Sequence, residues 1–180
     1  MLQRDRIVWS RKLAAAVVAA LDRYAPGLHS KNLDCLAFDI HPWDGILNLS
    51  LRLEEDRDPL QNEVCGLLLA DWLHAQFAIA HEDDRAETAW PEARPLAEIM
   101  QAGFNAALEA DPAASYEELA SPWYEACRDA ACHKHLWAKL ATFTRSREFC
   151  VIVANVDYSE RSFVIRDGVL AGTLAEYQRS

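Results

Sequence analysis

The sequence predicts an α+β domain in which helices cover an antiparallel sheet of about four strands. Two observations lead to this fold class. Segments with helical spacing and segments with strand spacing follow one another in the order α-β-β-α-α-α-β-β. The 180 residues are 51% hydrophobic and 26% charged, which is ordinary for a globular domain. At this length we expect one domain over residues 1–180.

The first predicted element is an amphipathic helix that ends before Pro26-Gly27. Its apolar face comprises Ile7, Ala14, Val17, Val18, Leu21 and Ala25. The apolar run at 13–21 is short and has no convincing cleavage site, so it is not a typical signal peptide. No stretch has the roughly 20 apolar residues that span a bilayer. We therefore expect a cytoplasmic protein that does not enter a membrane.

A β-hairpin is predicted next. Apolar and polar side chains alternate over residues 36–41 and again over 47–54. The sequence Pro42-Trp43-Asp44-Gly45 between them is typical of a turn, because proline fixes φ and glycine accepts positive φ.

Three helical regions and a second strand pair follow. The first helix is expected at 58–80, where it is buried and capped by Asp58, and the second at 96–108. The third region covers 115–141, with a Ser115/Glu118 capping box and a second helix start at Ser121-Pro122. Residues 149–156 and 162–166 are the predicted strands. Asp167-Gly168 is a turn signal that ends the second strand, and residues 170–177 are expected to form a terminal helix.

The negative charge is concentrated in the middle of the chain. The net charge is -10, yet residues 54–125 alone hold three basic and seventeen acidic side chains. Its densest clusters comprise Glu54, Glu55, Asp56 and Asp58, and Glu82, Asp83, Asp84 and Glu87. The acid excess argues against nucleic-acid binding, and neither cluster has the spacing of a calcium loop. The segment is either a solvated surface or a docking surface for a basic partner.

Two tryptophans in predicted loops are candidate anchors for such a partner. Trp43 lies in the hairpin turn and Trp90 precedes Pro91. Exposed aromatic side chains are typical of binding hot spots.

Asp39 and His41 are the best candidates for catalysis. They lie two residues apart on one strand face, about 7 Å, and could share a metal or ligand with His74 or His81. Cys35 is about 20 Å from His41 along the strand, which excludes direct proton transfer. The alternative interpretation is a polar strand face with a turn histidine.

Two further groups have the residue types of metal ligands but not their usual spacing. They are Cys127, Cys132, His133 and His135, and Asp71, His74 and His81. We expect buried thiols and structural histidines there, and neither a metal nor a cofactor. Phosphate-binding and nucleophile-elbow motifs are also missing from the sequence.

Residues 36–45, Leu-Ala-Phe-Asp-Ile-His-Pro-Trp-Asp-Gly, resemble bacterial proteins of domain-of-unknown-function type. Some proteins of similar size and acidity resemble the immunity proteins that neutralise the toxins of competing bacteria. The resemblance implies a protein partner and transfers no catalytic residue.

The leading hypothesis is therefore a protein-binding domain, in particular a toxin antagonist, that docks a basic partner through residues 54–125 with Trp43 or Trp90 as anchors. One alternative is a small metal-dependent or acid–base hydrolase that uses Asp39 and His41. A second alternative is a homo-oligomeric structural subunit.

Overall fold

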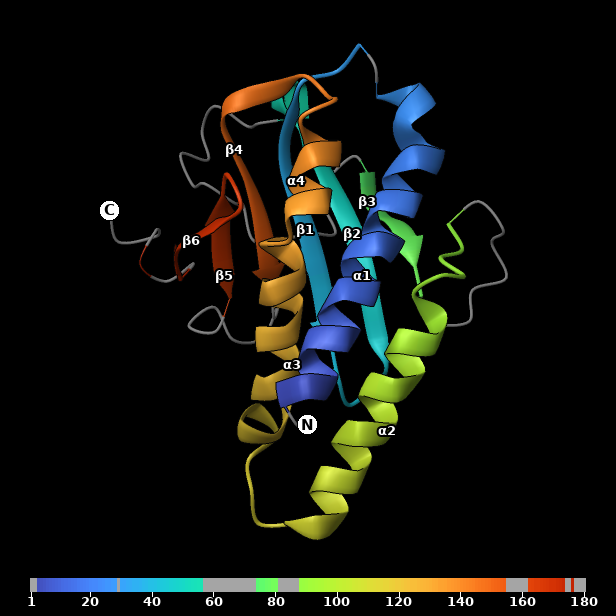
Figure 1. The fold of residues 1–180 in the computed structure, drawn as a ribbon, viewed down its shortest axis with the longest axis vertical. Helices are drawn as coiled ribbons and strands as arrows, with labels where there is room; N and C mark the ends of the chain where they lie inside the picture. The colour runs from blue at the N-terminus through green and yellow to red at the C-terminus, as the bar shows by residue number, and fades with distance from the viewer. Residues whose placement is uncertain are drawn as a thin grey trace.

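The computed structural model has the predicted α+β class, with helices lying against a mixed sheet (Figure 1). It describes residues 3–28, 30–56, 74–80, 88–154, 162–173 and 176. The helices are α1 (Gln3–Tyr24), α2 (Arg94–Ala110), α3 (Tyr116–Ala131) and α4 (Lys134–Leu140). The strands are β1 (Leu33–His41), β2 (Ile46–Leu53), β3 (His74–Ile79), β4 (Arg145–Ala154), β5 (Phe163–Arg166) and β6 (Val169–Thr173). Short 3-10 turns at Ala25–Gly27 and Glu54–Asp56 follow α1 and β2.

The six described strands form one sheet in the order β3-β2-β1-β4-β5-β6. The predicted β1–β2 hairpin is confirmed, with Phe38 opposite Leu49. The prediction of about four antiparallel strands is wrong, because β1 also pairs with β4 in parallel. Parallel neighbours need a long crossover, and the chain between these two strands includes α2, α3 and α4.

The two faces of the central strands are both buried but differ in chemistry. On β1, Leu36, Phe38 and Ile40 belong to the core that includes the helices. Cys35, Ala37 and Asp39 alternate with them and are also buried, on the far face. Burial on both faces is typical of a strand with a parallel neighbour.

Helices α1, α3 and α4 lie in front of the central strands in Figure 1, and α2 runs beside the lower half of α1. Tryptophan side chains tie α1 to the segment that contains α2. The Trp9 Nε1–H donates to the Leu96 carbonyl at 3.1 Å, and the Trp90 Nε1–H donates to the Ala16 carbonyl at 3.0 Å. These buried indoles pair their only donor, so their burial leaves no unsatisfied N–H.

The helix predicted over 58–80 is wrong at its end, where residues 74–79 form β3. Residues 57–73, including the predicted cap Asp58, lie outside the described part of the chain. An apolar run such as 77–80 fits a buried helix or a strand equally well. Pairing decides it, because Ala78 lies opposite Leu49 of β2 and gives the strand its hydrogen-bond partner.

The terminal helix predicted over 170–177 is also wrong, since residues 169–173 form β6. Asp167 and Gly168 have φ of 50° and 80° and form a two-residue turn between Arg166 and Val169. Positive φ at both positions is what a type I′ hairpin turn requires, and Asp-Gly provides it.

The helical region 115–141 divides differently from the prediction. The Ser115/Glu118 capping box is present and starts α3. Ser121-Pro122 does not start a helix, because Pro122 lies within α3. The helix ends at Ala131 with Cys132 as its C-cap, and His133 caps the separate helix α4.

Candidate functional site

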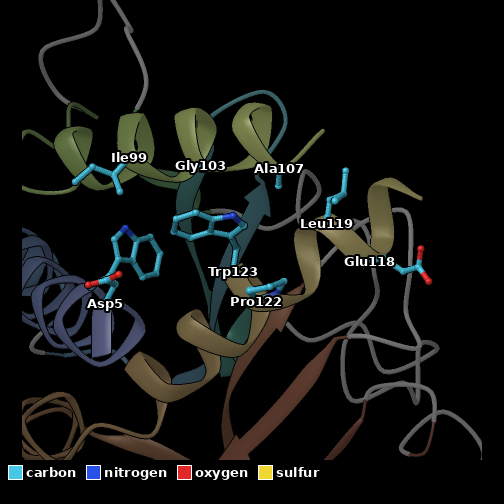
Figure 2. Close-up of a pocket in the computed structure, with 9 residues that line it drawn as sticks. Asp5, Ile99, Gly103, Ala107, Glu118, Leu119, Pro122 and Trp123 are labelled. Carbon is cyan, nitrogen blue, oxygen red and sulfur yellow. The ribbon is translucent and has the colours of Figure 1, made fainter. Parts of the chain in front are cut away.

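A groove of about 410 Å³ lies between α1, α2 and α3 (Figure 2). We call it the helical groove. Its lining consists of Asp5, Trp9, Ile99, Gly103, Ala107, Glu118, Leu119, Pro122 and Trp123. Seven of these nine residues are apolar or glycine, and none is a histidine, cysteine or serine. Such a lining can bind an apolar group but has no nucleophile.

Two indoles form the wall of the helical groove on the side of the core. The rings of Trp9 and Trp123 meet edge to face, with centroids 5.5 Å apart. Gly103 faces the second ring in Figure 2, and a Cβ there would lie 2.6 Å from Trp123 Cζ2. Glycine therefore allows α2 to approach the indole closely.

Carboxylates lie at the two ends of the helical groove. Figure 2 shows Asp5 on one side of Trp123 and Glu118 on the other. Glu118 is held by the Ser115 backbone N–H and hydroxyl, each donating at 3.1 Å. Among the described residues that line this groove, the two charged side chains are both carboxylates, which favour a cation.

A second apolar hollow of about 410 Å³ lies between α1 and the segment that leads into α2. Ile99 lines both hollows and is 52% exposed, so the apolar strip is continuous. Glu92 borders the second hollow. Its hydrogen bond from Arg23 holds the pKa of the carboxyl below its usual range.

The predicted acidic clusters lie elsewhere, as far as the structure describes them. Glu54, Glu55 and Asp56 follow the end of β2, whereas the β1–β2 turn and Trp43 lie at its beginning, about 26 Å away at strand rise. Two of these acids have side-chain partners: Glu55 forms an ion pair with Lys31, and Glu54 accepts a hydrogen bond from the Asn32 amide at 2.9 Å.

Asp56 accepts a hydrogen bond from the backbone N–H of Leu53 at 3.1 Å. The remaining predicted acids lie outside the described residues: Asp58, Glu82, Asp83, Asp84 and Glu87.

Only one of the two predicted anchors is accessible. Trp90 is 1% exposed and belongs to the core, so its assignment as an interface anchor is wrong. The Ala16 carbonyl satisfies its indole N–H, which lets a tryptophan after a loop become buried. Trp43 is half-buried and touches His41, Phe104 and Tyr116, with ring centroids 5.4–6.1 Å apart.

Asp39 and His41 meet, as the strand spacing predicts. His41 Nε2 lies 3.3 Å from Asp39 Oδ1. His74 is in β3 and His81 lies outside the described residues. Across the described ranges no group of three or more His, Cys, Asp or Glu residues is arranged to hold a metal.

The cysteine and histidine group near residue 130 is dispersed. Cys127 is buried in α3 and Cys132 is half-buried, and burial raises the pKa of both thiols. The rings of His133 and His135 stack edge to face, 5.1 Å apart, at the α3–α4 break. Asp71 of the other predicted group lies outside the described residues.

Sequence reasoning missed the helical groove. Ile99 falls at the apolar spacing of the helix predicted over 96–108, yet its side chain is half exposed. The detectable feature was Gly103, since an isolated glycine within a helical pattern often indicates close approach of another element.

Comparison with family models, curated proteins and solved structures gave no match to this chain. Among the described residues, none of the helices is both long and apolar enough to span a membrane.

Proposed function

We propose that the protein is a cytoplasmic protein-binding domain whose helical groove holds a partner segment with apolar and basic side chains. The observation that carries the proposal is an open apolar groove with a carboxylate at each end and no basic side chain among its described lining residues. Half-exposed Ile99 extends the same strip toward the second hollow. Apolar anchors surrounded by complementary charge are the usual composition of an interface.

Of the three helices around the groove, α2 and α3 favour a basic partner, whereas α1 holds five basic and two acidic side chains. Residues 94–131, from α2 through α3, hold two basic and seven acidic side chains. One of the two, Arg128, already contacts Asp129 at 3.0 Å. An arginine or lysine of the partner would complement Asp5 or Glu118, and its approach would be steered by the acidic helices.

The partner class that we propose is a bacterial toxin, which this domain would neutralise as an immunity protein. The likeness of some proteins of this size and acidity to immunity proteins supports that class, and the acidic helices α2 and α3 support a basic surface on the toxin. The groove replaces Glu54–Asp56 as the docking surface, because it combines carboxylates with an open apolar surface, whereas Glu55 is already ion-paired with Lys31.

Peptide selection tests this proposal. A phage library of random 12-residue peptides is selected on the wild-type protein and counter-selected on Ile99→Lys, which places a cation in the groove. We expect the enriched peptides to combine apolar residues with Arg or Lys, and to bind Ile99→Lys about tenfold more weakly than wild type.

Val169→Lys is the matched control. Val169 is 68% exposed on β6, away from the groove lining, and its change to lysine adds the same charge. Peptides that are acidic, or that lose affinity equally for Ile99→Lys and Val169→Lys, would refute binding in the groove.

A homo-oligomeric subunit is the second candidate. Strand β6 is at the end of the strand order, and Val169 and Leu170 are 68% and 44% exposed. Such an edge can pair with a second copy of the chain. Light scattering across a hundredfold range of concentration tests it: a dimer that Val169→Lys dissociates would support the subunit, and a constant monomer mass would exclude it.

A further inference from the structure

The far face of the sheet carries a row of buried polar side chains. In the β1–β2 register, Arg52 lies opposite Cys35, Ser50 opposite Ala37, and Asn48 opposite Asp39. Asn48, Ser50, Arg52 and Asp39 are all at most 7% exposed. Buried polar groups are nearly always paired, so each end of the row can be checked for its partners.

One end of the row is fully paired. Arg52 donates to Asp34 Oδ2 from Nε at 2.8 Å and from Nη2 at 2.7 Å. The Ser146 hydroxyl donates to Asp34 Oδ1 at 2.8 Å. A guanidinium and a hydroxyl thus compensate the buried carboxylate.

The other end of the row has acceptors without donors. Asp39 Oδ1 and Asn48 Oδ1 are both buried, and neither accepts a hydrogen bond. The two residues face each other in adjacent strands, where opposed Cβ atoms lie about 4.5–5.5 Å apart. A buried acceptor without a hydrogen bond keeps part of its desolvation cost, and the ion-pair contact of Asp39 Oδ1 with His41 offsets that cost for only one of the two oxygens.

His41 adds a third ligand atom at the same place. Its Nε2 approaches Asp39 Oδ1 to 3.3 Å without completing a hydrogen bond to that oxygen. Two ligand atoms that each bind a metal at 2.0–2.2 Å lie about 3.0–3.5 Å apart in octahedral or tetrahedral geometry. The observed separation of 3.3 Å falls within this range.

We propose that Asp39, His41 and Asn48 form a binding site for one divalent first-row metal ion, such as Zn²⁺ or Mn²⁺. Asp39 would supply a carboxylate oxygen, Asn48 its amide oxygen, and His41 Nε2. One imidazole with two oxygens suits these ions, whereas Ca²⁺ takes six to eight oxygens. With three protein ligands, the ion keeps positions open for water.

The ion can reach this site from the turn end of the hairpin. The His41 side chain is 18% exposed, more than that of Asp39, and it is followed by the turn that contains half-exposed Trp43. The register of the hairpin fixes all three residues, because Asp39 and His41 share one face of β1 and Asn48 is directly opposite. The site is therefore set by regular strands rather than by a loop.

Metal titration of the chelator-stripped full chain tests the proposal. Zn²⁺ and Mn²⁺ are titrated by calorimetry, and Co²⁺ is followed by its visible absorption. We expect one ion per chain and a rise of the thermal midpoint with metal concentration. Wild-type protein that binds none of these ions would overturn the proposal.

Two opposite substitutions make the test specific. Asp39→Asn removes the charge with little change of shape and should weaken binding at least about tenfold. Asn48→Asp adds a second carboxylate and should tighten binding about tenfold, while it lowers the thermal midpoint of the metal-free protein by carboxylate repulsion.

The double variant His133→Asn/His135→Asn is the control, because a partly exposed histidine pair can also hold Zn²⁺. It should bind metal as the wild type does. Loss of binding in this control would assign the ion to α4 and overturn the proposal. An Asn48→Asp variant that is destabilised and not rescued by metal would also overturn it, since Asn48 would then donate its amide N–H to Asp39.

Discussion

The buried ion pair between Asp34 and Arg52 is expected to dominate the stability of the far sheet face, and Arg52→Met tests this. Methionine keeps most of the aliphatic volume and removes the charge and both hydrogen bonds to Asp34. The Asp34 side chain is fully buried and that of Arg52 is 8% exposed. Water cannot readily replace the guanidinium, so the carboxylate is left inside the protein without its counter-charge.

The expected loss is about 3–5 kcal/mol of unfolding free energy, the usual result of removing one partner of a buried pair. For a chain of this size that corresponds to a fall of the thermal midpoint by about 6–20 °C. The double variant Asp34→Leu/Arg52→Met removes both charges and should recover most of the loss, because a buried pair replaced by apolar side chains costs little.

Urea unfolding followed by tryptophan fluorescence measures these free energies. Lys31→Met is the matched control, since Lys31 and Glu55 form an exposed ion pair near the same end of the hairpin. It should cost about 0–1 kcal/mol. If Arg52→Met costs no more than Lys31→Met, or if the double variant is less stable than the single one, the reasoning fails.

Three smaller predictions concern the helices. Ser115→Ala should lower the free energy of unfolding in urea by about 1 kcal/mol, because it removes the α3 cap. The control Ser121→Ala lies within the helix and should change that free energy by less than about 0.5 kcal/mol. Equal losses would contradict the observed helix start. Burial, followed by the nearby positive groups, lowers the pKa of His133 below 6.5. This residue's contribution to stability is therefore present above pH 6.5 and is lost as the pH falls through the lower native pKa. His133→Asn should flatten the pH dependence of the unfolding free energy measured from pH 7 to 5, and an unchanged slope would refute this. Iodoacetamide should modify half-buried Cys132 before Cys127, because the deeper burial of Cys127 raises its thiol pKa further. Site-resolved mass spectrometry measures the two rates, and equal rates would contradict the burial of Cys127.

Elements encoded by neighbouring residues were predictable. The β1–β2 hairpin follows from alternation over 36–54 and the turn between its strands, and the α3 cap follows from Ser115 and Glu118 alone. The strand β6 was also encoded locally by Asp167-Gly168, which is typical of a two-residue hairpin turn. The residues after the turn also fit helical spacing, which favours the helix predicted over 170–177 in place of this strand.

Elements decided by distant contacts were not predictable. Nothing near β1 indicates that β4 will be its parallel neighbour, because packing between segments more than a hundred residues apart selects that pairing. The same holds for the sites. Asp39 and His41 stand out two residues apart, but Asn48 joins them only in the hairpin register, and the helical groove needs three helices in place.

The parallel pairing of β1 with β4 has a consequence for the time course of folding. Leu36 contacts Val151 only after a loop of more than a hundred residues has closed, whereas the hairpin closes locally. A high sequence separation at the centre of the sheet slows the folding transition. The β1–β2 hairpin is therefore expected to form early, and the β1 edge stays unpaired until β4 pairs with it. During that interval the edge is open to pairing with other chains, so refolding yield should fall as protein concentration rises.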